Sequence, residues 1–224
     1  MVLKICILTT QQSWLFSELP KLTATLRDMG HEIQVTSDAE SVAESDLTFL
    51  LSYWGIVPTR ILERSRNNLV VHESALPLGR GWSPVTWQVL EGKNRIPVCL
   101  IEAAERFDSG PVYLTDFMTL RGDELLKEIR NEQARVTFDL CRKFVSQYPQ
   151  ILSRSSPQHG EETTYPRRGP ADSKLDAHRT IAEQFAVLRV VDNDAYPAFF
   201  ELNGINYKLQ IEKLPQDSKD DRHN

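Results

Sequence analysis

Apolar residues recur along the first half of the chain with two different periods. Residues 13–29 carry apolar side chains at helical spacing up to Gly30, and residues 58–66 form a candidate helix with a proline in its first turn. Strands that alternate with helices predict an α/β fold with a Rossmann-like, doubly wound and mostly parallel sheet. Three short apolar runs bounded by polar residues are typical of its buried strands: residues 4–10, 47–53 and 68–73. Residues 31–36 alternate between polar and apolar side chains, which predicts a further strand.

The second half of the chain predicts a different arrangement. Residues 97–103 and 112–120 form two candidate strands joined by a loop, and residues 123–147 form a long amphipathic helix. Three further elements follow: a long loop at residues 153–174, a helix at residues 181–190, and a hairpin at residues 199–211 that turns at Asn203 and Gly204.

This order of elements predicts the domain organisation. We expect a main domain over residues 1–150 and an extension packed on it over residues 151–214, which contains the long loop, the helix and the hairpin. Residues 215–224 are charged and lack apolar anchors, so we expect a flexible tail there. Phe199 and Ile211 in the hairpin suit either the core or the interface of a homodimer.

Composition and charge exclude several classes of protein. The 224 residues are 41% hydrophobic and 25% charged, which suffices for a buried core. The 26 basic and 31 acidic side chains leave a formal charge of −5, which argues against a nucleic-acid-binding or membrane-binding protein. The first residues lack the layout of a signal peptide. The three cysteines, Cys6, Cys99 and Cys141, show neither a disulfide framework nor metal-ligand spacing, so we expect a cytoplasmic protein without a metal.

The densest group of candidate functional residues lies at residues 70–84. His72 ends a predicted strand, and a glycine-punctuated loop follows it before a helix begins at Pro84. Ligands of open α/β sheets bind at the carboxyl ends of the strands. His72 is therefore either a functional base at this edge or a structural histidine beside a helix start.

Asp108 lies in the loop between the two later strands, two residues before Gly110. A tight turn at the glycine would bring the carboxylate back toward His72. A carboxylate beside an imidazole orients the ring and stabilises its charged form, as general acid–base catalysis requires. The alternative is a turn in which Asp108 caps its own backbone. Taken singly, Asp108 is better explained by the turn; taken together with His72 and the loop between them, we favour the pairing.

These residues carry a family resemblance. The pattern of His72, Ser74, Leu76-Pro77, Arg80-Gly81 and Pro84, followed by Asp108 and Gly110, resembles the core motif of the folate-dependent formyltransferases. The resemblance covers about residues 1–120. Residues 165–173 and 198–204 are similar to the continuation found in the sugar N-formyltransferases and in the N-terminal domain of methionyl-tRNA formyltransferase.

The resemblance implies the formyltransferase fold, with the catalytic domain at residues 1–150, and transfer of a formyl group from N10-formyltetrahydrofolate to an amine. His72 would move the proton of the attacking amine and stabilise the oxyanion, and Asp108 would orient His72. Residues 51–58 resemble the segment that lines the folate pocket. The implied folate-binding residues are Tyr53, Trp54, Gly55, Ile56, Ala104 and Phe107.

One position departs from the family pattern. The asparagine that normally precedes the histidine by two residues is Val70 here, and valine has no donor for the formyl oxygen. Asn68 lies on the same face but about 6–7 Å further along the strand. Three alternatives follow: a backbone amide of the loop at residues 79–81 replaces the asparagine, His72 acts alone, or the chain has lost activity.

The acceptor is expected to be a nucleotide-linked amino sugar of the 4-amino-4,6-dideoxy type, as in glycan biosynthesis of the pseudaminic-acid kind. Arg167 and Arg168 suit a diphosphate, although a solvated basic loop explains them as well. Residues 189–193 are a second candidate cluster or merely a polar helix terminus. The implied substrate-binding residues are Arg80, Gly81, Trp82, Tyr165, Arg167, Arg168, Arg189 and Asn193.

Two further functions remain open at this point. The first is a catalytically impaired module that binds folate or a nucleotide, which Val70 motivates. The second is formyl transfer to an aminoacyl or carrier-linked amine. Neither the sugar nor the nucleotide follows from the sequence.

Overall fold

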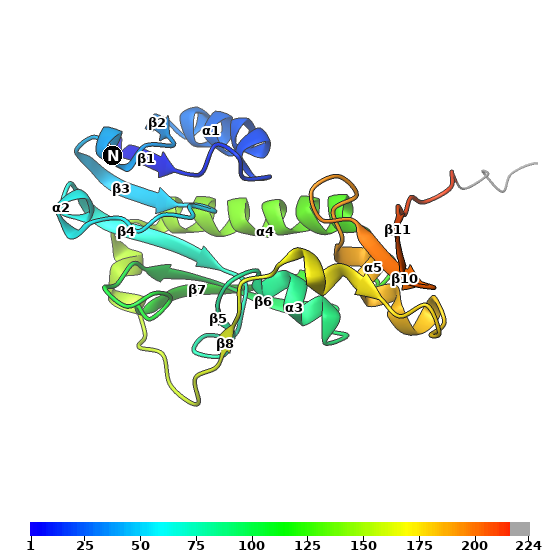
Figure 1. Ribbon diagram of the computed structural model, residues 1–224. Coiled ribbons are helices and arrows are strands. Elements are labelled where there is room, and N and C mark those ends of the chain that lie inside the picture. Colours follow the sequence, from blue (N-terminus) through cyan, green and yellow to red (C-terminus); the bar gives the residue numbers. More distant parts are fainter. Residues whose placement is uncertain (216–224) are drawn as a thin grey trace, which may run out of the picture. The chain divides into compact units, whose positions relative to one another are not determined.

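The structure, a computed structural model, describes residues 1–215 and divides the chain into two compact units (Figure 1). The first unit comprises residues 1–168, and the second begins at Gly169. The expected boundary at residue 150 lies before this division, because residues 156–166 pair with the first unit. The tail expected at residues 215–224 lies almost wholly outside the described residues.

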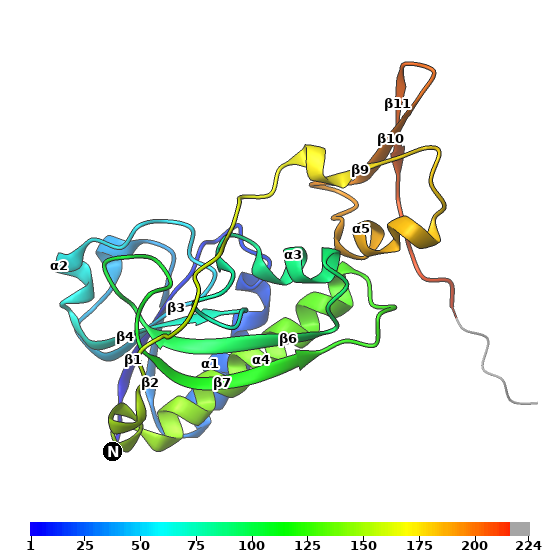
Figure 2. The ribbon, with the colours of Figure 1, turned by 90° about the horizontal axis from the view of Figure 1, so that it is seen from below.

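The first unit is built on a six-stranded sheet in the order β2-β1-β3-β4-β6-β7. The first four strands run parallel, and β6 and β7 are antiparallel, which confirms the mostly parallel α/β sheet. Figure 2 shows β6 and β7 side by side. The strands are β1 (Lys4–Leu8), β2 (Glu32–Thr36), β3 (Ser45–Leu50), β4 (Ser65–His72), β6 (Arg95–Glu102) and β7 (Val112–Thr119).

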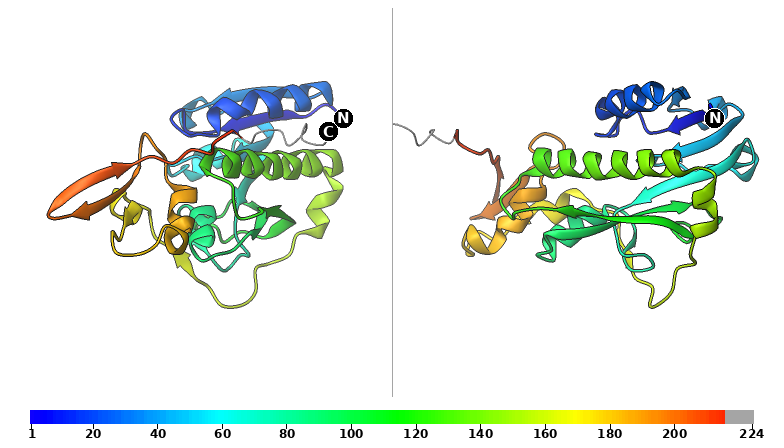
Figure 3. Two further views of the ribbon diagram at one scale, coloured as in Figure 1. Left: turned by 90° about the vertical axis from the view of Figure 1, so that its right-hand side faces the viewer. Right: turned by 180° about the vertical axis from the view of Figure 1, so that it is seen from behind.

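Two helices cover one face of this sheet, α1 (Leu19–Asp28) and α4 (Leu126–Gln147). Figure 3 shows them running along the sheet. The apolar stripe of α4 packs against β6 and β7, and Phe144 meets the rings of Phe49 and Tyr113 edge-on at 6.4 and 5.2 Å. Such aromatic pairs fasten the long helix to the middle of the sheet.

The opposite face carries the short helix α2 (Thr59–Leu62) and the 3-10 turn η2 (Ala39–Ser41). Here Cys6, Leu8, Val42 and Ile61 form a buried cluster. Leu8 pairs with Leu50, and Leu50 pairs with Val70. Because side chains alternate along a strand, Val70 and His72 point to this α2 face, away from α4.

A short two-stranded sheet lies beyond the end of β4. It pairs β5 (Arg80–Gly81) with β8 (Thr164–Tyr165), and α3 (Pro84–Leu90) follows β5. β8 belongs to the stretch that comes after α4 and the 3-10 turn η3 (Gln150–Arg154), which we name the return segment (residues 156–168). Its start is tied to β7 by the backbone bridge between Val112 and Ser156.

The second unit is a three-stranded sheet in the order β11-β10-β9 with one short helix, α5 (Phe185–Val190). Leu175, Leu188, Val191 and Ala198 form its buried cluster. The strands are β9 (Lys174–Leu175), β10 (Ala198–Leu202) and β11 (Ile205–Leu209). The 3-10 turn η4 (Pro170–Ser173) precedes β9, and the 3-10 turn η5 (Ala182–Gln184) precedes α5.

The predicted hairpin is confirmed, with Asn203 and Gly204 both at positive φ (51° and 77°) between β10 and β11. The helices are shorter than predicted. The helix predicted at residues 13–29 is a 3-10 turn, η1 (Phe16–Glu18), followed by α1. In residues 1–215, no helix has both the length and the apolar composition that a membrane span requires.

Candidate active site

His72 is the last residue of β4 and is only 5% exposed. Its Nε2 lies 2.8 Å from the carbonyl oxygen of Gly79, so the hydrogen on Nε2 donates to the loop that follows the strand. This bond orients the ring and leaves Nδ1 as the nitrogen that can exchange a proton. Strand β4 and the loop that contains Gly79 thus hold the imidazole in place, on the face of the sheet that carries α2.

Asp108 faces that edge. Its Oδ1 lies 3.5 Å from Nδ1 of His72, and its Oδ2 accepts a hydrogen bond from the backbone amide of Gly81 at 2.9 Å. The chain reaches this point because Gly110 turns back tightly against β6: a Cβ on Gly110 would lie 1.8 Å from the carbonyl oxygen of Glu102. The structure therefore brings His72 and Asp108 together, as the spacing of the motif predicted.

The backbone of Asp108 is held by a residue that sequence reasoning missed. Asp108 has a φ of 54°, in the left-handed region that non-glycine residues rarely adopt. The side-chain amide of Gln158 donates to the carbonyl oxygens of Asp108 at 2.7 Å and of Gly110 at 2.9 Å. Gln158 belongs to the return segment, 50 residues away in sequence, and no local pattern indicates this contact.

The side chain of Arg80 contacts two residues of the return segment. It is 8% exposed, its Nη1 lies 2.6 Å from Oε2 of Glu162, and its Nη2 donates to Oε1 of Gln158 at 2.6 Å. Glu162 also pairs with Arg106. The guanidinium of Arg80 thus contacts the return segment through one ion pair and one hydrogen bond. Among the residues that the structure describes, its Nε lies buried without a hydrogen-bond partner, and the expectation that Arg80 binds substrate stays a prediction.

The loop at residues 79–81 does not offer the free backbone amide that was one alternative for replacing the missing asparagine. The amide of Gly79 donates to Oγ1 of Thr163, that of Arg80 donates to the carbonyl oxygen of Thr163, and that of Gly81 donates to Asp108. All three are already satisfied by protein acceptors. The side chain of Asn68 donates to the carbonyl oxygen of Leu62 at 2.9 Å, so it does not replace the asparagine either.

Tyr165 packs against the loop at residues 79–81. Its hydroxyl donates to Glu91 at 2.8 Å, and its ring stacks on Trp87 with the ring centres 6.4 Å apart. A Cβ on Gly79 would lie 2.7 Å from the Tyr165 ring, and one on Gly81 would lie 2.6 Å from its carbonyl oxygen. Both glycines also have positive φ, so the close approach of the return segment requires them.

Trp82 and Arg167 form an exposed pair at the same loop. Trp82 is partly open to solvent, and the guanidinium carbon of Arg167 lies 5.1 Å from the centre of its ring. A cation that lies over an aromatic ring is attracted to it, and both side chains keep solvent-exposed surface that a ligand can contact. Arg168, the next residue, is half-buried.

The expected folate-binding residues present exposed apolar surface. Tyr53 packs against the cluster on the α2 face, the face to which His72 points. The amide of Trp54 donates to Oγ1 of Thr10 at 2.9 Å, which fastens this loop to the end of β1. Trp54, Ile56 and Phe107 are 52%, 75% and 65% exposed. Ala104 is exposed and Gly55 lies against the Tyr53 ring.

The last two expected substrate residues lie in the second unit. Arg189 is buried, at the end of α5. Asn193 exchanges two hydrogen bonds with the backbone of Ile211, through Nδ2 to the carbonyl oxygen at 2.9 Å and through Oδ1 from the amide at 3.2 Å. These contacts fasten the end of the hairpin and occupy the amide of Asn193.

A second carboxyl group lies beside His72. Glu73 directs its side chain to the α4 side, where its Oε1 accepts a hydrogen bond from Gln133 at 2.7 Å. Burial raises the pKa of the Glu73 carboxyl, the charge of Asp108 acts in the same direction, and His72 opposes both. No spacing rule pointed to Gln133, which lies 60 residues away.

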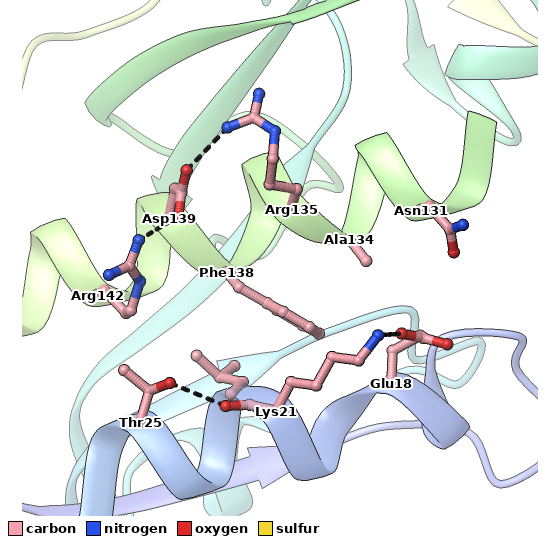
Figure 4. A pocket seen from close by; sticks show the side chains of 10 residues that line it. Glu18, Lys21, Thr25, Asn131, Ala134, Arg135, Phe138, Asp139 and Arg142 are labelled. Carbon is pink, nitrogen blue, oxygen red and sulfur yellow. Dashed lines mark hydrogen bonds and ion pairs between the residues drawn. The ribbon is translucent and has the colours of Figure 1, made fainter. Parts of the chain in front are cut away.

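A separate hollow of about 490 Å³ lies between α1 and α4 (Figure 4). Its charged groups bind one another: Asp139 pairs with both Arg135 and Arg142, and Lys21 pairs with Glu18 at 2.5 Å. It contains none of the motif residues. Within residues 1–215, no group of three or more His, Cys, Asp or Glu side chains is arranged to hold a metal ion.

Solved structures share this fold over nearly the whole chain. Methionyl-tRNA formyltransferase from Clostridium thermocellum has a TM-score of 0.75 at 20% identity and covers 96% of this chain and 94% of its own. A 4-N formyltransferase from Francisella tularensis has a TM-score of 0.70 at 15% identity, with coverages of 95% and 99%. HypX from Aquifex aeolicus in complex with tetrahydrofolic acid has a TM-score of 0.74 at 18% identity, with coverages of 94% and 38%.

Sequence comparison gives related results. Methionyl-tRNA formyltransferase of Leifsonia xyli is 28% identical over 169 residues, which is 75% of this chain and 56% of that protein. The Symbiobacterium thermophilum protein of the same name is 29% identical over 194 residues, or 86% and 54%. The chain thus spans about half the length of these curated relatives. The family model described as formyl transferase matches residues 17–137, more than half of the sequence. The chain therefore belongs to the formyl transferase family.

Proposed function

We propose that this protein is an N-formyltransferase that moves the formyl group of N10-formyltetrahydrofolate to the amine of a nucleotide-linked amino sugar. The observation that carries the proposal is the contact between His72 and Asp108 at the carboxyl end of β4. An imidazole and a carboxylate from separate loops, held at the edge where α/β sheets bind ligands, are suited to moving a proton.

The folate supplies an activated formyl group, and the residues of this chain handle the protons and charge of the transfer. Nε2 of His72 is occupied by Gly79, so Nδ1 is the atom that accepts the proton of the attacking amine. The Asp108 carboxylate then stabilises the imidazolium. The separation of 3.5 Å between Nδ1 and Oδ1 exceeds that of a direct hydrogen bond, which leaves room for a substrate atom or a water to bind both groups.

Val70 leaves the formyl oxygen without the amide donor that the family pattern would place there. Because the amides of residues 79–81 and the side chain of Asn68 are engaged, the protonated His72 is the donor that we assign to this oxygen. One donor to a developing oxyanion is worth on the order of 10²–10³ in rate. A slow enzyme is therefore the expected result, rather than a binding module without turnover.

The exposure of the large apolar side chains of Trp54, Ile56 and Phe107 supports folate binding. Large apolar side chains that remain exposed on a folded domain mark ligand or partner sites. The similarity of the fold to HypX, which was solved with tetrahydrofolic acid, also supports a folate as the formyl donor.

Arg167 and Trp82 support a nucleotide-linked acceptor. A guanidinium binds phosphate oxygens through parallel N–H groups, and an indole ring stacks on a nucleobase. The similar fold of a 4-N formyltransferase also favours a sugar amine. The formal charge of −5 does not favour a nucleic-acid acceptor.

Methionyl-tRNA is the second candidate acceptor, because the two relatives quoted above are named as methionyl-tRNA formyltransferases. The test incubates the protein with formyltetrahydrofolate and, separately, with UDP- and dTDP-linked 4-amino-4,6-dideoxy sugars and methionyl-tRNA. We expect a gain of one formyl group on an amino sugar only. Formylated methionyl-tRNA would assign the second candidate instead, and no product with any acceptor would refute the proposal.

Two variants link the activity to the site. His72→Asn and Asp108→Asn should each lower kcat by about 10²-fold or more while the fold persists. A conservative change of a carboxylate in the second unit that binds Thr180 and Arg179, Glu183→Gln, should leave kcat unchanged.

A further inference from the structure

Two loops meet at the candidate site, and each of them holds one member of the pair of His72 and Asp108. The loop at residues 79–81 holds the imidazole, because the carbonyl oxygen of Gly79 accepts the hydrogen on Nε2. The loop at residues 103–111, between β6 and β7, carries Asp108. The separation of 3.5 Å between Nδ1 and Oδ1 therefore depends on how these two loops are held against each other.

The carboxylate of Glu162 binds one arginine from each of these loops. Its Oε2 lies 2.6 Å from Nη1 of Arg80, and its Oε1 pairs with Nη2 of Arg106. Glu162 itself lies in the return segment, which belongs to neither loop. We name this contact of one carboxylate with two guanidinium groups the Glu162 bridge. Hydrogen bonds between ionised groups are stronger than neutral ones, so the bridge is suited to holding two loops together.

Arg106, at one end of the bridge, is fixed relative to Asp108 by the turn that contains both residues. The hydroxyl of Ser109 donates to the carbonyl oxygen of Arg106 at 2.7 Å, so the turn closes around Asp108. Asp108 lies at φ 54°, a conformation that persists only where the surroundings hold it. The ion pair at Arg106 thus helps to fix the backbone that carries the Asp108 carboxylate.

Arg80, at the other end, lies between Gly79 and Gly81, the two residues of its loop that bind the imidazole and the carboxylate of the pair. The side chain of Arg80 is only 10% exposed. Water and salt screen a buried ion pair less than an exposed one, so this end of the bridge anchors Glu162. Without that carboxylate, the buried guanidinium would keep the neutral acceptor on Gln158. A buried charge without a counter-ion is costly, so the loop would rearrange.

We propose that Glu162 is a positioning residue of the transferase, an assignment that rests on the proposed function. By holding Arg80 and Arg106 on one carboxylate, it fixes the two loops against each other. It thereby sets the separation between His72 and Asp108, on which the transfer of the proton depends. Across the described part of the chain, Glu162 makes no hydrogen bond or ion pair with either of these two residues, so it acts through their placement.

The Glu162 bridge and the contacts of Gln158 hold Asp108 from opposite sides of the turn. Gln158 binds the backbone of Asp108 and of Gly110, which follow the bend, whereas Glu162 binds Arg106, which precedes it. Because each link restrains a different part of the loop, loss of one should loosen the turn without releasing it. A moderate loss of rate is therefore the expected result.

The test measures kcat and both KM values with formyltetrahydrofolate and the nucleotide-linked amino sugar that the unmodified protein formylates fastest. Glu162→Gln removes the charge at nearly constant shape, and Arg106→Gln removes the exposed end of the bridge. The double variant shows whether the two residues act through one contact. Glu161→Gln is the matched control, because Glu161 is the exposed neighbour and binds no other side chain within residues 1–215.

We expect Glu162→Gln to lower kcat about tenfold and Arg106→Gln to lower it about threefold, because small displacements of catalytic groups are costly and the buried end persists without Arg106. The double variant should match Glu162→Gln instead of showing the product of the two losses. Both KM values should stay within about threefold of those of the unmodified protein, and Glu161→Gln should match it throughout.

A second measurement does not need turnover. The isotope-labelled imidazole of His72, assigned in NMR spectra by comparison with His72→Asn, reports the placement of the Asp108 carboxylate beside Nδ1. We expect the Nδ1 resonance to shift in Glu162→Gln and in Arg106→Gln and to stay in place in Glu161→Gln. A purely structural role of Glu162 would lower the urea midpoint without moving this resonance.

Two results would overturn the assignment. The first is an unchanged kcat in folded Glu162→Gln and Arg106→Gln proteins. The second is a rise in KM with kcat unchanged, which would place the bridge in a binding site. A failure of the proposed function differs from both: the unmodified protein then forms no product with any acceptor, and the His72 resonance alone decides whether Glu162 sets the placement of the pair.

Discussion

The side-chain amide of Gln158 donates to the backbone carbonyl oxygen of Asp108 at 2.7 Å, and this bond holds Asp108 in its left-handed conformation at φ 54°. A strained residue of this kind costs about 1–3 kcal/mol and persists only where its surroundings hold it. The return segment thus sets the position of a carboxylate that lies 50 residues earlier in the chain.

Replacing Gln158 tests that relationship. Gln158→Leu removes both donors to the loop and the acceptor of Arg80, so Asp108 should move relative to His72. We expect kcat to fall about 10- to 100-fold, because small displacements of catalytic groups are costly, with little change in KM for folate. Gln150→Leu, at an exposed glutamine of η3, is the control. Unaltered kcat in a folded Gln158→Leu protein would show that Asp108 holds its position without this bond.

Gly110, in the loop between β6 and β7, is expected to be intolerant of any side chain. Gly110→Ala places a Cβ 1.8 Å from the carbonyl oxygen of Glu102, which only a backbone shift can relieve. The free energy of unfolding should fall by about 3 kcal/mol or more. Gly169→Ala, where no heavy atom lies within 4 Å, should change it by less than about 1 kcal/mol. Urea denaturation measures both, and equal stabilities would contradict the close approach.

The buried thiol of Cys6 makes the free energy of unfolding depend on pH in the alkaline range. Burial raises the pKa of its thiol from 9.0 to about 11, so the folded chain keeps this proton over a range in which the unfolded chain has lost it. The contribution is fully present below about pH 9 and is lost as the pH rises toward about 11, amounting to about 2 kcal/mol.

The measurement compares urea midpoints near pH 8 and near pH 10.5 for the unmodified protein and Cys6→Ala. Other buried acids titrate in both proteins, so the difference between their pH dependences isolates Cys6. We expect the smaller decline in Cys6→Ala. Parallel declines would mean that the thiol is not protected by the fold.

A variant of Arg167 tests the proposal that the acceptor is linked to a nucleotide. Arg167→Ala removes the exposed guanidinium over Trp82, so KM for the nucleotide sugar should rise about tenfold while kcat stays within about twofold. Arg154→Ala, which removes an exposed arginine of η3, should change neither constant. A fall in kcat with unchanged KM would instead place Arg167 among the groups that support the catalytic loop.

Several elements could be predicted because their signals are local. The apolar runs that became β1 and β3 are buried at consecutive positions and so face a core on both sides. The asparagine–glycine pair at residues 203–204 fits the two positive φ values of a tight turn. The helix predicted over residues 58–66 is shorter in the structure, where α2 spans Thr59–Leu62, because contacts with another strand end it. Ser65 bonds to Ser45 and Thr48 on β3, and this pairing starts β4 where helical spacing would continue α2.

The sequence by itself determined the α/β architecture and pointed to His72 and Asp108 as a pair at the candidate site, since strand ends and tight turns are set by neighbouring side chains and by glycine. Tertiary structure alone decided which groups remain free to react. The tertiary structure places Arg80 against Glu162 and Gln158. It also engages the backbone amides of residues 79–81 in hydrogen bonds and lets Gln133 donate a hydrogen bond to Glu73. These contacts join residues about 30 to 80 positions apart, and such pairings depend on how whole loops pack, which no local period encodes.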